Sequence, residues 1–333
     1  MSKWFLRGVS LLLMLCLLPL CALAEDKPPQ PIPLIDENEI TPTPSGVHHY
    51  MMICIDQWGF DFESLGAHTD GLILVTVDEY SQRIMLTSFI RDLLIERFDG
   101  KFGRINNIFY YYQTDHLNLK RGTEDSAREA IEELVRTISV HFDLDIEKYI
   151  VVDFTQVQAI VDAIGGVDMY ISSREAKRMR SFNIDMPGAG VYHLKGYEAV
   201  IYMRMRKTAY EWDDENGVHH KETQDEGRTH RTRNVLSAIA DKMATIDEDQ
   251  MWDVVDIVME HTILTNLSNS DLFEIIRLAL AVQGAPLEQI RMPVDGTYWQ
   301  NSVAGMATEE ILDWEANRNA LHEFLYDQDF FVR

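Results

Sequence analysis

The stretch YMMICI (residues 50–55) decides where the fold begins, and LILVTV (residues 72–77) and RIMLTSF (residues 83–89) follow it. Each is a short apolar run that is rich in β-branched residues and bounded by turn residues, which is typical of buried strands. Only the five residues 78–82 separate the last two runs, so these two runs are expected to form a hairpin. The sequence therefore predicts a β-sheet that begins close to residue 50.

Beyond the hairpin, helix patterns alternate with strand patterns. Apolar residues at helical spacing fill Ser126–His141, and a strand pattern at Tyr149–Phe154 precedes a helix at Thr155–Ile164. Gly165-Gly166 is expected to end that helix before the strand Val167–Ile171. Later segments are expected to form helices at 196–203, 228–245, 271–282 and 308–325 and a short strand at 290–293. This alternation predicts an α/β fold, a layered α-β-α single domain with a central mixed sheet.

The first 24 residues have the features of an export signal. Lys3 and Arg7 precede the apolar run Val9–Leu20, and Ala22-Leu23-Ala24 offers a small-residue cleavage pattern. A retained single-pass anchor is the alternative, but the apolar run is shorter than the roughly 20 residues that a spanning helix needs. We expect a cleaved signal and a protein that works outside the cytoplasm, either secreted or anchored at the cell surface or cell wall.

Residues 25–46 are rich in proline and acidic residues, so we expect an extended spacer rather than a helix or a central strand. The folded domain is then expected to occupy residues 47–333. Within it, the polar segment Thr208–Glu226 is expected to be a surface loop, in which His219-His220 is more simply a solvated pair than a metal site.

The overall charge excludes one class of function. The chain carries a formal net charge of −24, whereas proteins that bind nucleic acid present basic surfaces to phosphate. Loss of the signal would leave only Cys54, so no internal disulfide is expected. Because Cys54 lies within the apolar run, it is expected to be a buried hydrophobic residue rather than a nucleophile.

Arginines recur at the ends of the predicted elements despite the acidic composition. They are Arg91, Arg204, Arg206, Arg228 and Arg231. Guanidinium groups bind phosphate oxygens through two parallel hydrogen bonds, which lysine cannot do. Arg228 and Arg231 are three residues apart, which should place both on one helix face. The alternative is that all five form surface ion pairs with the many carboxylates.

Two aspartates lie at strand ends, where they could meet. Asp56 ends the first strand, and Asp70 immediately precedes the second. If these strands are neighbours, the two carboxylates emerge at one edge of the sheet and could hold a magnesium ion that bridges to a substrate phosphate. An aspartate at a strand end is, by itself, more often a turn former.

Several segments resemble, in order and spacing, those of the LytR–CpsA–Psr family. They are Cys54-Ile55-Asp56, His68-Thr69-Asp70-Gly71, Ser88-Phe89-Ile90-Arg91-Asp92, Arg104-Ile105-Asn106, Tyr149–Phe154, Ile164-Gly165-Gly166-Val167, Leu194-Lys195-Gly196, Tyr202-Met203-Arg204-Met205-Arg206 and Gly227-Arg228-Thr229-His230-Arg231-Thr232-Arg233. The similarity covers a core at about residues 48–283, with residues 284–333 as a C-terminal extension. No single segment is specific, but their common order is.

The resemblance implies a phosphotransferase that acts outside the cell membrane. It would move a glycopolymer phosphate, such as teichoic acid or capsule, from an undecaprenyl-pyrophosphate carrier to peptidoglycan. The carrier's lipid would bring the protein to the membrane surface and would occupy an apolar tunnel. The alternative is that Val151, Val152, Phe154, Ile160 and Val161, the apolar residues in question, are simply core.

The resemblance also assigns roles to individual residues. Asp56 and Asp70 would hold Mg²⁺, and Asn106 would shape the pocket. Asp92 would orient Arg91 or act as a base. Catalysis would rest on Arg91, Asp92 and Arg206, and substrate binding on Arg204, Arg228, Arg231 and Asn106.

Three positions depart from the family pattern. His68 stands where arginine is common, Ile90 where proline is frequent, and Thr232 where glutamine is usual. Two alternatives to transfer therefore stay open: a non-catalytic binder of polyprenyl-linked glycan, and a polyprenyl-pyrophosphate hydrolase. A third, direct contact with DNA as a transcriptional attenuator, is disfavoured by the export signal and the acidic charge.

Overall fold

The computed structural model describes residues 28–326, except residues 64, 116–119, 214–216, 223 and 304. The expected export signal, residues 1–24, lies outside the described residues. Among the helices that are described, none is long and apolar enough to span a bilayer.

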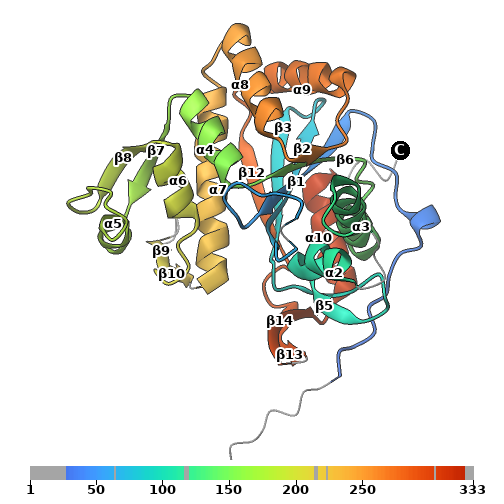
Figure 1. Cartoon of the computed structure of the whole chain (residues 1–333). Helices are drawn as coiled ribbons and strands as arrows, with labels where there is room; N and C mark the ends of the chain where they lie inside the picture. The colour runs from blue at the N-terminus through green and yellow to red at the C-terminus, as the bar shows by residue number, and fades with distance from the viewer. Residues whose placement is uncertain are drawn as a thin grey trace, which may run out of the picture.

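A six-stranded sheet forms the centre of the domain (Figure 1). Its order is β11 (Leu264–Thr265), β6 (Lys148–Val152), β1 (Val47–Ile55), β2 (Thr69–Asp78), β3 (Arg83–Phe89) and β12 (Leu287–Met292). The pairs β1–β6 and β3–β12 are parallel, and the other three are antiparallel. The sheet is therefore mixed, as expected, and the hairpin formed by β2 and β3 is confirmed.

Strand β1 contributes side chains to both faces of the sheet in alternation. Met51, Ile53 and Ile55 are fully buried in one hydrophobic core, whereas Met52 and Cys54 face the opposite side and are only partly buried. Successive side chains of a strand point to opposite faces of the sheet, so one strand serves two environments. The first face builds the core, and the second faces the cavities described below.

Helices cover both faces of the sheet, as the layered prediction requires (Figure 1). The core on the Met51 face is closed by α2 (Ile108–Thr114), α3 (Glu124–Phe142) and α10 (Trp314–Leu325). The second core, on the other face, is built by α4 (Phe154–Ala163), α5 (Ser173–Arg180), α6 (Gly196–Met203), α7 (Gln224–Met243), α8 (Glu248–His261) and α9 (Asn269–Ala281). Four short hairpins lie outside the central sheet: β4 (Leu94–Glu96) with β5 (Phe102–Arg104), β7 (Val167–Ile171) with β8 (Gly190–Leu194), β9 (Tyr210–Asp213) with β10 (His219–Glu222), and β13 (Tyr298–Val303) with β14 (Met306–Ile311). Two 3₁₀ turns, Glu37–Glu39 and Ile105–Asn107, complete the described elements.

Two sequence expectations were wrong. The last helix begins at Trp314 rather than at residue 308, because residues 306–311 pair as β14 and the Asp313 carboxylate caps the helix by accepting from the backbone N–H of Ala316. The segment 208–226, expected to be a loop, contains the β9–β10 hairpin, in which Trp212 stacks on His220 at 4.9 Å between ring centroids. Helix α8 was not predicted at all, although its Asp247–Gln250 capping box is a start signal.

The proline-rich segment is not a detached spacer over its described part. The backbone N–H of Ile35 donates to the carbonyl of Val140 at 2.9 Å, and the Thr41 hydroxyl donates to the Asp143 carboxylate at 2.7 Å. Apart from the 3₁₀ turn Glu37–Glu39, the described part of the segment forms no helix or strand, and its prolines do not prevent it from lying along the domain.

Gly196 at the start of α6 offers a stability test. A Cβ at this position would overlap the carbonyl oxygen of Gln158 in α4, whereas a Cβ at Gly188 would meet no atom within 4 Å. We expect Gly196→Ala to lower the free energy of unfolding by about 1–3 kcal/mol through overpacking. Gly188→Ala is the matched control and should be close to neutral. Urea unfolding measures both, and equal stabilities would contradict the close packing of α4 against α6.

Candidate functional site

A cavity of about 420 Å³, here called the site cavity, opens on the Met52 face of the sheet beside α7. Two carboxylates and three guanidiniums line it, namely those of Asp56, Asp70, Arg204, Arg206 and Arg228. Its remaining walls are mostly apolar. Five of the aspartates and arginines that the sequence singled out therefore line one cavity, and Arg91 reaches it through its contact with Asp70. Asp92 and Arg231 lie outside the wall, as described below.

Asp70 is the centre of the polar wall. Its carboxylate lies 2.7 Å from an Arg91 nitrogen and 2.8 Å from an Arg228 nitrogen, and it accepts from the side-chain amide of Asn106 at 2.7 Å. The Asp70 side chain is only 7% exposed. Burial would raise the pKa of Asp70, but Arg228, Arg91 and the Asn106 amide hold it well below its usual range. Asp70 is therefore a permanent anion that fixes two guanidiniums.

Asp56 lies beside Asp70 because β1 and β2 are antiparallel neighbours, with Ile55 opposite Thr69. Burial raises the pKa of Asp56, and the nearby carboxylate of Asp70 raises it further. The Arg204 guanidinium lies 3.6 Å from the Asp56 carboxylate. Two adjacent carboxylates with this mutual repulsion are a place where a bound cation would be stabilised.

The carboxylate pair fits magnesium better than a metal that needs a full protein cage. The described residues contain no group of three or more histidine, cysteine, aspartate and glutamate side chains placed to hold a metal. Mg²⁺ prefers hard oxygen ligands and commonly takes one or two carboxylates, completing its shell with water and substrate phosphate. Asp56 and Asp70 are the residues that could supply those carboxylates.

The remaining arginines of the site differ in their supports. Arg204 lies over the ring of Phe154 at 4.4 Å, and it is 40% exposed, so its charge remains accessible. Arg206 is exposed and lines the same cavity. Both follow α6, whose last residue is Met203, so the end of that helix carries both charges to the cavity mouth.

Asp92 lies behind Arg91 and is not part of the cavity wall. Its carboxylate is 3.5 Å from the Nε of Arg91 and 3.2 Å from Arg104, and its backbone carbonyl accepts from Glu309. The resemblance implied that Asp92 either orients Arg91 or acts as a base. This geometry favours the first role. Arg104 is a support that we did not single out from the sequence, although it lies in one of the quoted segments.

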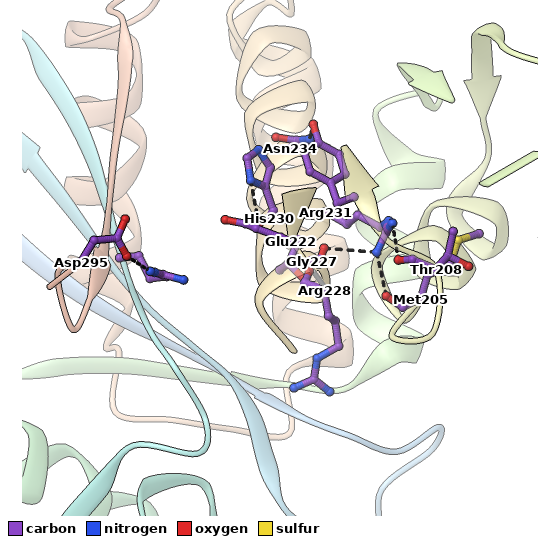
Figure 2. A network of polar contacts seen from close by, with 12 residues as sticks. Met205, Thr208, Glu222, Gly227, Arg228, His230, Arg231, Asn234 and Asp295 are labelled. Atoms are coloured by element: carbon purple, nitrogen blue, oxygen red, sulfur yellow. Dashed lines mark hydrogen bonds and ion pairs between the residues drawn. The ribbon is translucent and has the colours of Figure 1, made fainter. Parts of the chain in front are cut away.

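For Arg231 the structure contradicts the expected role in substrate binding. Its side chain is fully buried and pairs with Glu175 at 2.7 Å, and it also donates to the backbone carbonyls of Met205, Thr208 and Gly227. Figure 2 shows Arg228 and Arg231 leaving α7 in different directions. Side chains three residues apart on a helix point in directions that differ by about 60° around its axis. Here that angle directs Arg228 into the site cavity and Arg231 into the protein interior.

A second, apolar cavity of about 490 Å³ continues along the same face of the sheet. It lies between strands β1, β2, β3 and β6 and the helices α7, α8 and α9, and Met52 lines both cavities. Of the five residues proposed for a tunnel, Val152, Phe154 and Ile160 line the site cavity. Val151 and Val161 are fully buried in the two cores, so these two are core residues rather than tunnel residues.

Two of the three positions that depart from the family pattern, His68 and Thr232, make specific local contacts. The ring of His68 packs on Tyr110 at 5.2 Å between centroids, and Thr232 lines the site cavity while its hydroxyl donates to the Arg228 carbonyl at 3.1 Å. Cys54 also lines this cavity, but burial raises the pKa of its thiol to about 12. Cys54 is therefore a wall residue rather than a thiolate nucleophile at neutral pH.

Comparison with known proteins gives a consistent picture. The profile of the LytR_cpsA_psr family matches residues 52–320. A polyisoprenyl-teichoic acid–peptidoglycan teichoic acid transferase, TagU of Bacillus licheniformis, is 27% identical over 207 residues, which are 62% of this chain and 56% of TagU. This chain spans about half the length of the curated relatives that it matches.

Solved structures share the fold. TagT bound to LIIa-WTA superposes with a TM-score of 0.61 at 18% identity, covering 84% of this chain and 91% of TagT. TagT (YwtF) with bound octaprenyl pyrophosphate lipid gives 0.57 at 17% identity, covering 84% of this chain and 91% of that one. At this identity the match establishes the fold alone.

The buried Arg231–Glu175 pair predicts a large effect on stability. Arg231→Met leaves the Glu175 carboxylate buried without its partner, so we expect the free energy of unfolding to fall by about 3–5 kcal/mol. Arg174→Met is the matched control, because Arg174 is an exposed arginine paired with Glu211, and it should change stability by less than about 1 kcal/mol.

Adding Glu175→Gln to Arg231→Met should restore part of the loss, because the amide removes the unpaired charge. Chemical denaturation of the four proteins measures these differences. If Arg231→Met kept the stability of the wild type and lost only substrate binding, Arg231 would be a substrate-binding residue after all.

Proposed function

Because the chain belongs to the LytR_cpsA_psr family, we propose that it transfers a glycopolymer phosphate from a polyprenyl-pyrophosphate carrier to peptidoglycan. The relatives named as teichoic acid transferases support this reaction class, and the TagT structure with octaprenyl pyrophosphate supports the class of donor. The two alternatives, a non-catalytic binder of the same donor and a hydrolase, use the same site.

The observation that carries the proposal is the shared wall of the two cavities. The site cavity has guanidiniums at its mouth, the apolar cavity has almost entirely hydrophobic walls, and Met52 lines both. A molecule that matches this arrangement has a doubly charged diphosphate joined to a long hydrocarbon tail. A free nucleotide or sugar phosphate would leave the apolar cavity unfilled.

The residues then take definite parts in the reaction. Arg91 and Arg228, held by Asp70, and the exposed Arg204 and Arg206 would bind the diphosphate oxygens. The acceptor hydroxyl attacks the phosphorus that bears the glycan and gives up its proton. The bond to the bridging oxygen breaks, and polyprenyl phosphate leaves and takes up that proton. Enzymes promote such transfers chiefly by alignment and charge neutralisation, which rigid arginines supply.

Magnesium is part of the proposal, with Asp56 and Asp70 as its protein ligands. When bound, the ion would neutralise charge that develops on the diphosphate oxygens. The raised pKa of Asp56, caused by burial and by the charge of Asp70, supports a role in which a cation relieves the repulsion between the two carboxylates.

The location of the reaction follows from its substrates. Peptidoglycan and the lipid carrier meet at the outer side of the cell membrane, so we propose that the protein works there and contacts the membrane through its donor. The net charge of −24 agrees with partners other than nucleic acid.

Asp70→Asn is the sharpest test of the polar wall. The neutral amide neither fixes Arg91 and Arg228 by charge nor binds Mg²⁺ strongly, so we expect kcat to fall by at least about 100-fold. The measurement is release of polyprenyl phosphate from a polyprenyl-pyrophosphate glycan at several Mg²⁺ concentrations. Asp168→Asn is the control, because Asp168 is exposed and pairs with His193 on the β7–β8 hairpin.

The same assay separates the alternatives. A transferase releases polyprenyl phosphate only when peptidoglycan is present and forms a glycan–peptidoglycan product. A hydrolase releases it without an acceptor, and a binder releases none. Full activity of Asp70→Asn would contradict the assignment of the polar wall as the site.

Met52→Trp tests the junction of the two cavities. A bulky ring at this position would obstruct the path between them, so we expect KM for a long-chain polyprenyl donor to rise at least about tenfold. KM for a donor with a tail of one or two isoprene units should change little, and this short donor is the internal control. Steady-state kinetics with both donors measures the difference, and equal effects on both would contradict a tail in the apolar cavity.

A further inference from the structure

Two aromatic side chains stand exposed outside the site cavity. Trp58 and Tyr197 are 39% and 45% exposed, and their ring centroids lie 6.0 Å apart with 35° between the planes. Trp58 also packs on Phe154, at 5.7 Å, and Phe154 lines the cavity under the Arg204 guanidinium. A continuous row of contacting rings, tilted against one another, therefore leads from the cavity to the surface.

Both rings are held by rigid backbone. The loop that carries Trp58 is fixed to the start of α4: the Phe60 N–H donates to the Asp153 carboxylate at 2.7 Å, and the Gly59 N–H donates to the Thr155 hydroxyl at 3.1 Å. Tyr197 follows Gly196, which packs directly against α4. The positions of the two rings are thus set before any ligand binds, which lowers the entropy lost on binding.

We infer that Trp58 and Tyr197 form a subsite for a pyranose ring, on which one of the two glycan substrates stacks next to the reacting phosphate. This inference rests on the proposed function, which brings two glycans to the mouth of the cavity. The C–H bonds on one face of a pyranose carry slight positive charge and meet the negative face of an aromatic ring, while the hydroxyls stay in water. The sugar belongs either to the donor glycan or to the peptidoglycan acceptor.

A membrane contact is the competing explanation for exposed tryptophan and tyrosine, since both are enriched at bilayer interfaces. The surroundings favour the sugar. The anchoring loop runs from Asp56 to the start of α4, so both rings lie beside the polar wall of the site cavity, where the reacting phosphate is proposed to bind. The rings also continue the wall of the cavity rather than forming a separate apolar patch.

The test is kinetic and uses Trp58→Ala and Tyr197→Ala in the full-length protein. With donor and acceptor concentrations varied in turn, we expect KM for one glycan substrate to rise about three- to tenfold for each variant, the size of one lost aromatic stack. Trp58→Phe should recover most of the loss because it keeps a ring. Tyr170→Ala is the control, since Tyr170 is 65% exposed on β7 and is not among the residues that line the site cavity.

The arm that responds identifies the sugar: a change confined to acceptor KM assigns the subsite to peptidoglycan, and one confined to donor KM assigns it to the carrier's glycan. Unchanged KM values in both arms overturn the subsite. If the variants instead lose binding to vesicles of phosphatidylglycerol and phosphatidylethanolamine, the rings are a membrane contact and the inference is wrong.

A binding measurement separates this inference from the proposed function. Titration of the wild-type protein and of Trp58→Ala with a soluble peptidoglycan oligosaccharide, and with the glycan released from the donor, is followed by isothermal titration calorimetry. Binding of either sugar that Trp58→Ala abolishes supports the subsite even if the protein transfers nothing. Conversely, a protein that transfers normally but whose two alanine variants match the wild type keeps its function and loses the subsite.

Discussion

The ion pairs of Asp70 hold the candidate site together. One buried carboxylate joins Arg91, which follows β3, to Arg228, which comes from α7 almost 160 residues after Asp70 itself. Removal of charges from water is costly, so a buried anion of this kind persists only where its partners are fixed around it. The sheet supplies that fixity, because β1, β2 and β3 are consecutive neighbours and their ends lie together. Arg204 and Arg206 reach the same cavity independently, from the end of α6.

Much of this arrangement could be predicted from the sequence, for a physical reason. Strand runs such as residues 50–55 and 72–77 show their nature through local composition, and short connections make neighbours of consecutive strands. Asp56 and Asp70 therefore came to one sheet edge on the pattern alone. The arginines could be assigned to a site only from the order of the segments along the chain, and no single segment was sufficient.

What could not be predicted depended on directions and on distant packing. The i, i+3 spacing placed Arg228 and Arg231 on one helix face, yet Arg231 is drawn into the protein by Glu175 of α5 and by three backbone carbonyls. The strands of the β9–β10 hairpin have only four residues each, and β10 contains no apolar residue, so the hydrophobic periodicity is too short to indicate a hairpin. The stacking of Trp212 on His220 is visible only in three dimensions. Trp58 was likewise invisible as a functional candidate, because a single tryptophan in a loop has no pattern.

The alternation along β1 has a consequence for how such proteins diversify. Odd-numbered positions from 49 to 55 face the buried interior, and the intervening positions 50, 52 and 54 face the two cavities. Under the proposed function, adaptation to a longer, shorter or differently branched carrier can proceed by exchange of alternate residues on a single strand. The alternate residues that build the core are left unchanged. Ligand specificity and folding stability therefore depend on different residues of the same strand.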